Sequence, residues 1–102
     1  MRVISRRKLR EFWEKHSDAK TSLLLWYQRT INAKWHNLAD VRQAYPSADI
    51  VGSFTVFNIG GNKYRLITFI DYESQIVFTR YVLTHAEYDK EKWKNDDWFS
   101  NS

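Results

Sequence analysis

The sequence has no cysteine, one proline and three glycines among its 102 residues. The lack of cysteine excludes a disulfide framework and a zinc site built from thiolates. Long apolar runs are also missing, since a stretch such as 23–27 is far shorter than the roughly 20 residues that cross a bilayer. We therefore expect a soluble, cytoplasmic protein with no membrane partner. A chain of this length with 43% hydrophobic residues forms one core, so we expect a single domain over residues 1–102.

Basic residues gather at one end of the chain. Residues 1–20 hold seven Lys or Arg against three acids, within a net charge of +4. The sequence also carries five Trp, six Tyr and six Phe. Cations neutralise phosphates and flat rings stack on unpaired bases, so this composition favours a nucleic-acid partner. The alternative is that the rings form the core and the basic helix face is only solvated.

Helical spacing dominates the first half of the sequence. The pattern predicts a first helix capped by Ser5. Its apolar side chains Leu9, Phe12 and Trp13 lie on one stripe, with His16 at the edge of that stripe. A second helix begins at Ser17 or Asp18 and runs to about Lys34, forming a helical hairpin with the first. A short helical turn over 37–45 ends at the single proline, which cannot continue a helix.

The second half changes to strand character. Segments 50–59, 63–72 and 75–84 are rich in β-branched and aromatic residues and are separated by short turns. The turn 60–62, Gly-Gly-Asn, lacks the third glycine of a dinucleotide fingerprint and the Lys-Ser/Thr of a P-loop, so a hairpin explains it better. We expect an α+β fold: an N-terminal helical hairpin packed on a three- or four-stranded antiparallel sheet, with a short C-terminal helix.

The C-terminal helix begins with a capping box at 84–87, Thr-His-Ala-Glu. His85 then occupies the first helical position, where the positive end of the helix dipole disfavours imidazolium and favours a neutral proton acceptor. One helical face carries His85, Tyr88, Asp89 and Lys92. The alternative for Tyr88 is structural, as a hydrophobic anchor that packs on Leu83 at the helix start.

Two arginines are predicted to share a face of the sheet. If the turn at 73–74 contains two or four residues, the antiparallel register places Arg65 opposite Val82 and on the same side as Arg80. Lys63 has the same parity, at the end of the sheet where the last helix begins. We therefore expect Arg65, Arg80 and His85 to converge on one phosphate-sized site. The alternative is that each arginine caps the sheet edge or pairs with an acid such as Glu87.

This set of side chains suits the metal-independent cleavage of RNA. A base removes the proton of the ribose 2′-hydroxyl, fixed cations stabilise the attacked phosphate, and an acid protonates the departing 5′-oxygen. Arg65 and Arg80 supply the cations. His85 and Tyr88 share the roles of base and acid in an order that the sequence leaves open, and we expect no metal or other cofactor.

Two segments of the chain resemble the HigB family of type II toxins. They are 58–67, with Gly-Gly-Asn-x-x-Arg, and 77–90, with Thr-His-x-Glu-Tyr-Asp. The resemblance extends over nearly all of residues 2–95. It implies a RelE-like fold and an mRNA interferase, an endoribonuclease that often acts on translating ribosomes. It also implies inhibition by a HigA-type antitoxin.

The resemblance also implies roles for individual residues. Four of them fall on the family's motif positions and are the predicted catalytic residues: Arg65, Arg80, His85 and Tyr88. Lys63 and Lys92 are predicted to grip the RNA backbone. The tail 94–102 lies outside the motifs, and its role is left open. The alternative function is a RelE-like binding module that inhibits a nucleic-acid machine such as gyrase without cutting RNA.

Overall fold

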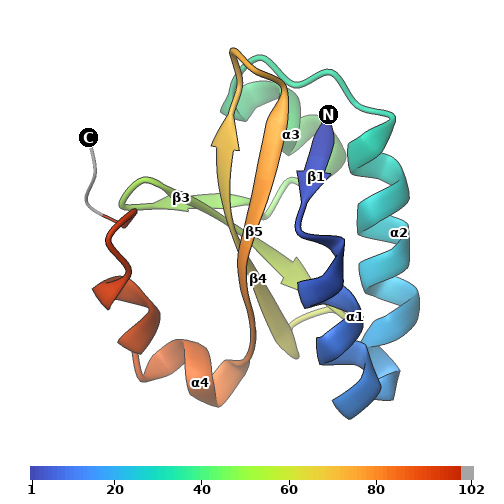
Figure 1. Cartoon of the computed structure of the whole chain (residues 1–102), viewed down its shortest axis with the longest axis vertical. Helices are drawn as coiled ribbons and strands as arrows, with labels where there is room; N and C mark the ends of the chain where they lie inside the picture. Colours follow the sequence, from blue (N-terminus) through green and yellow to red (C-terminus); the bar gives the residue numbers. More distant parts are fainter. Residues whose placement is uncertain (100–102) are drawn as a thin grey trace.

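The computed structural model describes residues 1–99, in which helices precede most of the strands (Figure 1). The first half contains β1 (Arg2–Ile4), α1 (Arg6–Lys15), the 3-10 turn η1 (Ser17–Ala19), α2 (Lys20–Ile31) and α3 (Leu38–Ala44). The second half contains β2 (Asp49–Val51), β3 (Phe54–Ile59), β4 (Tyr64–Asp71), β5 (Ile76–Thr84), α4 (His85–Asp89) and the 3-10 turn η2 (Lys92–Asn95). The predicted α+β class and the helical hairpin are confirmed, although α2 ends three residues before the predicted Lys34.

The sheet has five strands in the order β1-β5-β4-β3-β2, one more than the upper end of the prediction. The segment 50–59 is not one strand, because Gly52 adopts a left-handed φ of 62° and turns β2 back onto β3. The second new strand is β1, which pairs in parallel with β5. Strands of three residues are too short to leave a periodic pattern, so the sequence did not predict them.

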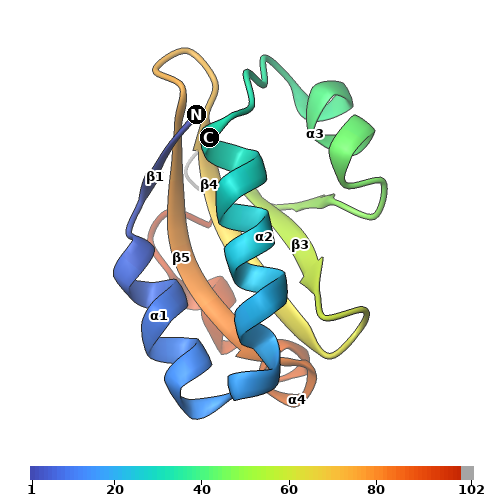
Figure 2. The same ribbon diagram turned by 90° about the vertical axis from the view of Figure 1, so that its right-hand side faces the viewer.

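The sheet separates two apolar cores. Figures 1 and 2 show α1, α2 and α3 on one side of it and α4 with the C-terminal segment, residues 92–99, on the other. Successive side chains of β4 point to opposite faces of the sheet and so contribute to both cores: Leu66 packs with the helices and Ile67 with the C-terminal segment. The larger core on the helical side includes Leu9, Leu23, Trp26, Phe57 and Leu66, and the smaller one contains Phe54, Val56, Ile67 and Trp93. Within the described residues, no helix has both the length and the apolarity that crossing a membrane requires.

The C-terminal segment closes the smaller core; its residues 94–99 belong to the tail 94–102 whose role the sequence left open, and 100–102 lie outside the described residues. Trp93 is buried, with 4% of its surface exposed. The Ser53 backbone N–H donates to the Phe99 carbonyl at 2.8 Å, which ties the segment to the turn between β2 and β3. A Cβ atom on Gly52 would lie 2.5 Å from the same Phe99 oxygen, so this turn requires a glycine both for its φ and for its space. The segment is therefore an integral layer of the fold.

Candidate RNA-binding and catalytic site

A β-bulge sets the positions of the two arginines. The turn between β4 and β5 has four residues, 72–75, and the pairing from Asp71 with Ile76 to Thr68 with Thr79 follows the predicted register. Between Ile67 and Thr68 the register shifts by one residue, so Arg65 lies opposite Leu83 and not opposite the predicted Val82. The prediction was wrong here because a bulge inserts an unpaired residue into one strand, and its position follows from packing across the whole sheet.

Arg80 is the residue that the bulge leaves without a cross-strand partner. Its guanidinium carbon lies 3.9 Å from the centroid of the Trp98 ring, on the side of the C-terminal segment. Arg65 points to the same side, with its guanidinium carbon 5.6 Å from the centroid of the Tyr88 ring. The predicted common face is thus present, but the two positions are roughly 10 Å apart along the strands.

Arg80 is paired with Asp96. The Arg80 Nε and Nη2 atoms donate to Asp96 Oδ2 at 3.2 and 2.5 Å, and the Tyr81 hydroxyl donates to the same oxygen at 2.8 Å. The Trp98 backbone N–H donates to the other carboxylate oxygen at 2.8 Å. The alternative that an acid binds Arg80 is therefore confirmed, but the acid is Asp96 and not Glu87.

The Asp96 carboxylate is almost fully enclosed, with 3% of its side chain exposed against 24% for Arg80. Burial acts to raise the pKa of Asp96, but the hydrogen bonds from Trp98, Arg80 and Tyr81 outweigh it and hold this pKa below its ordinary value. Burial and the Asp96 charge together raise the pKa of the Tyr81 phenol. Asp96 is therefore ionised at neutral pH and compensates the charge of Arg80.

Arg65 keeps an uncompensated charge. Its Nη1 donates to the carbonyls of Asn62 and Tyr64 at 3.1 and 3.2 Å, and its Nη2 donates to Asn62 Oδ1 at 3.1 Å. No carboxylate among residues 1–99 lies within ion-pair distance of it. The hairpin turn that holds it is the predicted Gly-Gly-Asn turn, in which Gly60 and Gly61 have φ of 62° and 70°.

The start of α4 holds His85 beside this turn. The predicted capping box is present: Thr84 Oγ1 accepts from the Glu87 N–H at 3.2 Å, and Glu87 Oε1 accepts from the Thr84 N–H at 2.9 Å. The His85 backbone N–H donates to the Lys63 carbonyl at 3.2 Å. His85 is therefore a diagonal neighbour of Arg65 across β4 and β5, at about 8 Å between Cα atoms.

A carboxylate orients the His85 ring. The ring Nδ1 lies 3.0 Å from Asp89 Oδ2, and 51% of the His85 side chain is exposed. A neutral imidazole in this contact carries its proton on Nδ1, toward the carboxylate, and has its lone pair on Nε2. Asp89 thus fixes the orientation of a histidine ring that is half exposed to solvent.

The helical face predicted to join His85 and Lys92 does not exist. The helix α4 ends at Asp89, Glu91 has a left-handed φ of 59°, and Lys92 begins a separate 3-10 turn. Tyr88 does face the predicted direction and stacks on Trp93, with ring centroids 5.1 Å apart and planes at 17°. Both Tyr88 and Leu83 pack on the smaller core, which is compatible with the anchor alternative for Tyr88 and leaves its catalytic role a prediction.

Lys63 is held by an acid that the sequence did not reveal. Its ammonium lies 3.2 Å from Asp18 Oδ2, and the Tyr64 hydroxyl donates to Asp18 Oδ1 at 2.6 Å. The hydrogen bonds from Tyr64 and Lys63 lower the pKa of Asp18, and the bond to Asp18 raises the pKa of the Tyr64 phenol. Asp18 lies in η1, 45 residues from Lys63, so no local pattern could have paired them.

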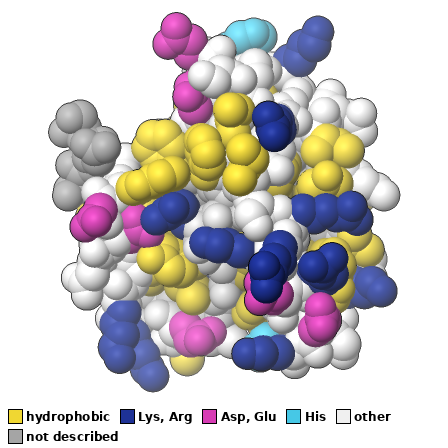
Figure 3. Space-filling model, viewed as in Figure 1, with side chains coloured by type: hydrophobic (Ala, Val, Ile, Leu, Met, Phe, Trp, Pro, Cys, Tyr) yellow, Lys and Arg dark blue, Asp and Glu magenta, His cyan; other side chains and the backbone are white. Residues whose placement is uncertain are grey.

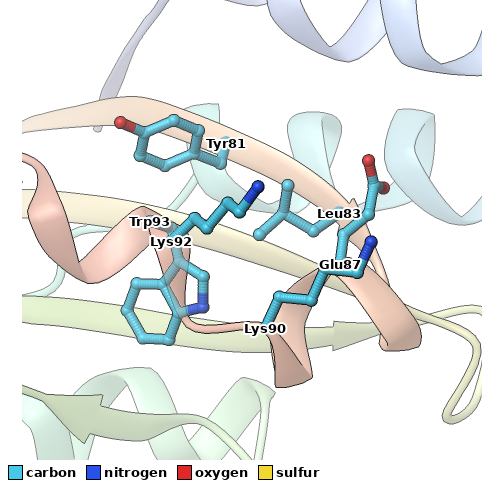
Figure 4. Close-up of a pocket in the computed structure, with 6 residues that line it drawn as sticks. All are labelled: Tyr81, Leu83, Glu87, Lys90, Lys92 and Trp93. Atoms are coloured by element: carbon cyan, nitrogen blue, oxygen red, sulfur yellow. The ribbon is translucent and has the colours of Figure 1, made fainter.

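Two hollows adjoin the site. The first has a volume of about 300 Å³ and is lined by Tyr81, Leu83, Glu87, Lys90, Lys92 and Trp93 (Figure 4). The second, about 420 Å³, lies between α1 and β5 and includes Arg80 in its wall. Arg65, His85 and Tyr88 line neither hollow.

The structure therefore gathers three of the predicted catalytic residues, Arg65, His85 and Tyr88. Arg80 stands apart, five residues before His85 in the sequence and so roughly 16 Å from it along the strand. The predicted convergence on one phosphate-sized spot thus fits Arg65 and His85 by position, and Arg80 belongs to the neighbouring hollow.

The fold and these side chains define a small α+β protein with a basic sheet face and a histidine at the start of its last helix. Comparison with known families identifies the class of protein. The model of the HigB toxin family, described as the RelE-like toxic component of a toxin-antitoxin system, matches residues 19–91. This range includes the predicted catalytic residues, whereas Lys92 and the rest of the C-terminal segment lie outside it.

Relatives support the same conclusion. The mRNA interferase toxin HigB of Escherichia coli (strain K12) is 30% identical over 92 residues, which span 87% of this chain and 88% of the relative. The mRNA interferase HigB of Shigella flexneri gives the same values. That of Escherichia coli O6:H1 is 27% identical over 93 residues, spanning 88% and 90%. The chain belongs to the HigB family of RelE-like toxins, and membership of a toxin-antitoxin family implies an antitoxin partner.

Proposed function

We propose that this toxin is an endoribonuclease that cuts mRNA by attack of the ribose 2′-hydroxyl on the adjacent phosphate, without a metal ion. The observation that carries the proposal is the arrangement of His85: its Nδ1 is held by Asp89 at 3.0 Å, and its backbone N–H is tied to the turn that presents Arg65. The His85 imidazole and the uncompensated Arg65 guanidinium thus come from neighbouring positions of the sheet, with Cα atoms about 8 Å apart. The relatives named mRNA interferase support the substrate class.

Each residue has a role in this proposal. His85 Nε2 takes the 2′-hydroxyl proton, and Arg65 stabilises the charge that builds on the phosphate oxygens. The Tyr88 phenol donates a proton to the departing 5′-oxygen. The products are a 2′,3′-cyclic phosphate and a free 5′-hydroxyl. Because Arg80 is compensated by Asp96 and lies farther away, we propose that it contacts a flanking phosphate.

Backbone contacts come from lysines at the edges of the site. We propose that Lys63 and Lys92 bind RNA phosphates, as the sequence predicts. Lys92 projects into the first hollow (Figure 4), and Lys63 lies beside the Arg65 turn with its charge shared with Asp18. Among residues 1–99 there is no group of three or more His, Asp or Glu side chains that could hold a metal ion, so EDTA is not expected to abolish cleavage.

The test is cleavage of RNA by the purified protein, with and without ribosomes, read as the chemistry of the new ends. His85→Gln removes the proposed general base and is expected to slow cleavage about 10²–10⁴-fold. Arg65→Ala removes the cation that stabilises the phosphate and is expected to slow it about 10²–10³-fold. His36→Gln is the matched control, because His36 pairs with Asp40 at 3.4 Å in the same i, i+4 geometry far from the site. DNA of the same sequence lacks the 2′-hydroxyl and is expected to survive.

Growth distinguishes cutting from non-cutting toxicity. Expression of the protein is expected to arrest cells, and His85→Gln or Arg65→Ala is expected to relieve the arrest. If both variants fold and remain toxic, the nuclease proposal fails and the gyrase-type binding module is the better description.

We further propose a HigA-type antitoxin as the neutralising partner, a cytoplasmic location, action on translating ribosomes, and a single domain over residues 1–102.

A further inference from the structure

The second hollow is a cleft between α1 and β5. Its α1 wall includes Lys8, Lys15 and His16, and its β5 wall includes Arg80 and Tyr81. The bulge helps to build it: Arg80 is unpaired in the sheet, and its free carbonyl accepts from the Lys8 ammonium at 3.2 Å. Figure 3 shows Lys and Arg side chains gathered across this face of the molecule, over β5 and α1.

The cleft carries an excess of positive charge. Two acids line it: Glu11 is paired with Arg7 at 3.4 Å, whereas Glu87 accepts only a backbone hydrogen bond in the capping box of α4 and keeps its charge. In the described part of the chain no carboxylate lies within ion-pair distance of Lys8 or Lys15. The cleft therefore attracts an anion.

The two lysines are spaced along α1 so that they can contact different parts of an extended anion. Lys8 and Lys15 are seven residues apart on α1, which places them on one face and about 10 Å apart along the helix axis. At this backbone spacing the two flexible side chains can reach two different phosphates of one strand. The cleft is thus matched to a polyanion that runs along α1.

The cleft adjoins the other hollow. The two share Tyr81 and Glu87 in their walls, so they are neighbours, with Lys8 and Lys15 on the α1 side and Lys90 and Lys92 on the other. Glu87 lies two residues after His85, which places the catalytic helix beside both hollows. A groove that combines cations with an aromatic ring such as Tyr81 is the usual surface for single-stranded nucleic acid.

We infer that the α1–β5 cleft binds the phosphate backbone of single-stranded RNA on one side of the cleavage point, with Lys8 and Lys15 contacting different phosphates. The inference rests on the proposed function for the identity of the strand. It assigns to the basic N-terminal helix a role in holding substrate that is separate from the chemistry at His85.

The test measures binding without cleavage. The probe is a short single-stranded RNA with every 2′-hydroxyl methylated, which removes the nucleophile, and its affinity is followed by fluorescence anisotropy over a series of salt concentrations. Loss of two phosphate contacts in the Lys8→Gln/Lys15→Gln variant is expected to reduce the slope of log K against log salt by about 1.4. The same loss weakens binding roughly 10- to 30-fold at 0.1 M salt.

A matched variant controls for net charge. Lys20→Gln/Lys34→Gln removes the same two charges from exposed positions outside the cleft, and its slope is expected to stay that of the wild type. Equal slopes for the wild type and the Lys8/Lys15 variant overturn the inference, as do equal changes for the two double variants. Competition by poly-glutamate also overturns the inference if poly-glutamate displaces the probe as effectively, per charge, as unlabelled RNA does. The cleft then accepts any polyanion, including an acidic protein.

The inference and the proposed function fail separately. If the wild type binds the methylated RNA with a slope that depends on Lys8 and Lys15 but cuts no natural RNA, the cleft stands and the nuclease proposal falls. If natural RNA is cut and the double variant has the wild-type KM and kcat, the cleft assignment falls alone. The expected result is a raised KM with kcat close to that of the wild type.

Discussion

Removing the charge of Asp96 is the sharpest test of how the C-terminal segment is held. The Asp96→Asn variant keeps the size of the side chain but turns one of its oxygens into an amide group that donates. The new amide nitrogen replaces either the oxygen that accepts from Arg80 and Tyr81 or the oxygen that accepts from the Trp98 N–H. In both orientations the charge-assisted bonds to Arg80 are weakened and one donor is left facing another donor.

The size of the effect follows from burial. Breaking a buried ion pair from one side costs about 3–5 kcal/mol, and hydrogen bonds to charged groups contribute about 1.5–3 kcal/mol. Because 24% of the Arg80 side chain remains exposed, water recovers part of the loss, and we expect about 2–3 kcal/mol. For a chain of this length the melting temperature then falls by about 10–20 °C.

The assay is thermal unfolding of the wild type, Asp96→Asn and Asp97→Asn. Asp97 is the neighbouring residue, exposed, and its substitution removes the same charge, so it is expected to change stability by less than about 0.5 kcal/mol. If the two variants melt together, the Arg80 pair does not hold the segment and the reasoning is refuted.

Acid provides a second readout of the same pair. The pKa of folded Asp96 lies below its ordinary value of 3.8, so its contribution to stability is fully present above that value and is lost as the pH falls through the lower, folded pKa. The stability gap between the wild type and Asp96→Asn is therefore expected to be largest at neutral pH and to close below about pH 4. A gap that is unchanged in acid contradicts an ionised Asp96.

Three further predictions concern the fold around the site. Gly52→Ala is expected to destabilise the protein by more than about 1 kcal/mol in a urea titration, because φ is left-handed and a backbone oxygen of the C-terminal segment lies 2.5 Å from the new Cβ. Gly61 has a φ of +70° but nothing within 4 Å of a new Cβ, so Gly61→Ala is expected to cost less in the same titration. Thr84→Ala removes the cap of α4 and is expected to cost about 1 kcal/mol, whereas restoring a cap with Ser is expected to recover it. Asp18→Asn is expected to return the raised pKa of Tyr64 toward 10.0, its ordinary value, which a phenolate absorbance titration detects as an earlier transition; an unchanged titration curve contradicts the hydrogen bond between them.

Local signals predicted most of the elements of the site. The capping box at Thr84 placed the start of the last helix, and His85 with it, because a cap depends on residues within one helical turn. The antiparallel register across the turn at 73–74 placed Arg65 near that helix, because paired positions on two hairpin strands sum to a constant. The motif resemblance named the family, which the comparisons confirm.

Contacts between distant residues were beyond such signals. The bulge at Arg80 changes the strand register by one residue, and no local pattern marks it. The partners Asp96 for Arg80 and Asp18 for Lys63 come from segments 16 and 45 residues away. A left-handed Glu91 ends the helical periodicity that linked His85 to Lys92, although the residue types alone favour continuation.

The sequence by itself determined the class of fold, the helical hairpin, the main hairpin turns and the position of His85 at a helix start, because each depends on periodicity or on capping and turn chemistry within a few residues. Only the tertiary structure decided which charges remain free. Arg65 is uncompensated while Arg80 is paired, and Lys8 and Lys15 line an open cleft, because ion pairing and concavity are set by which segments the sheet and its two cores bring into contact.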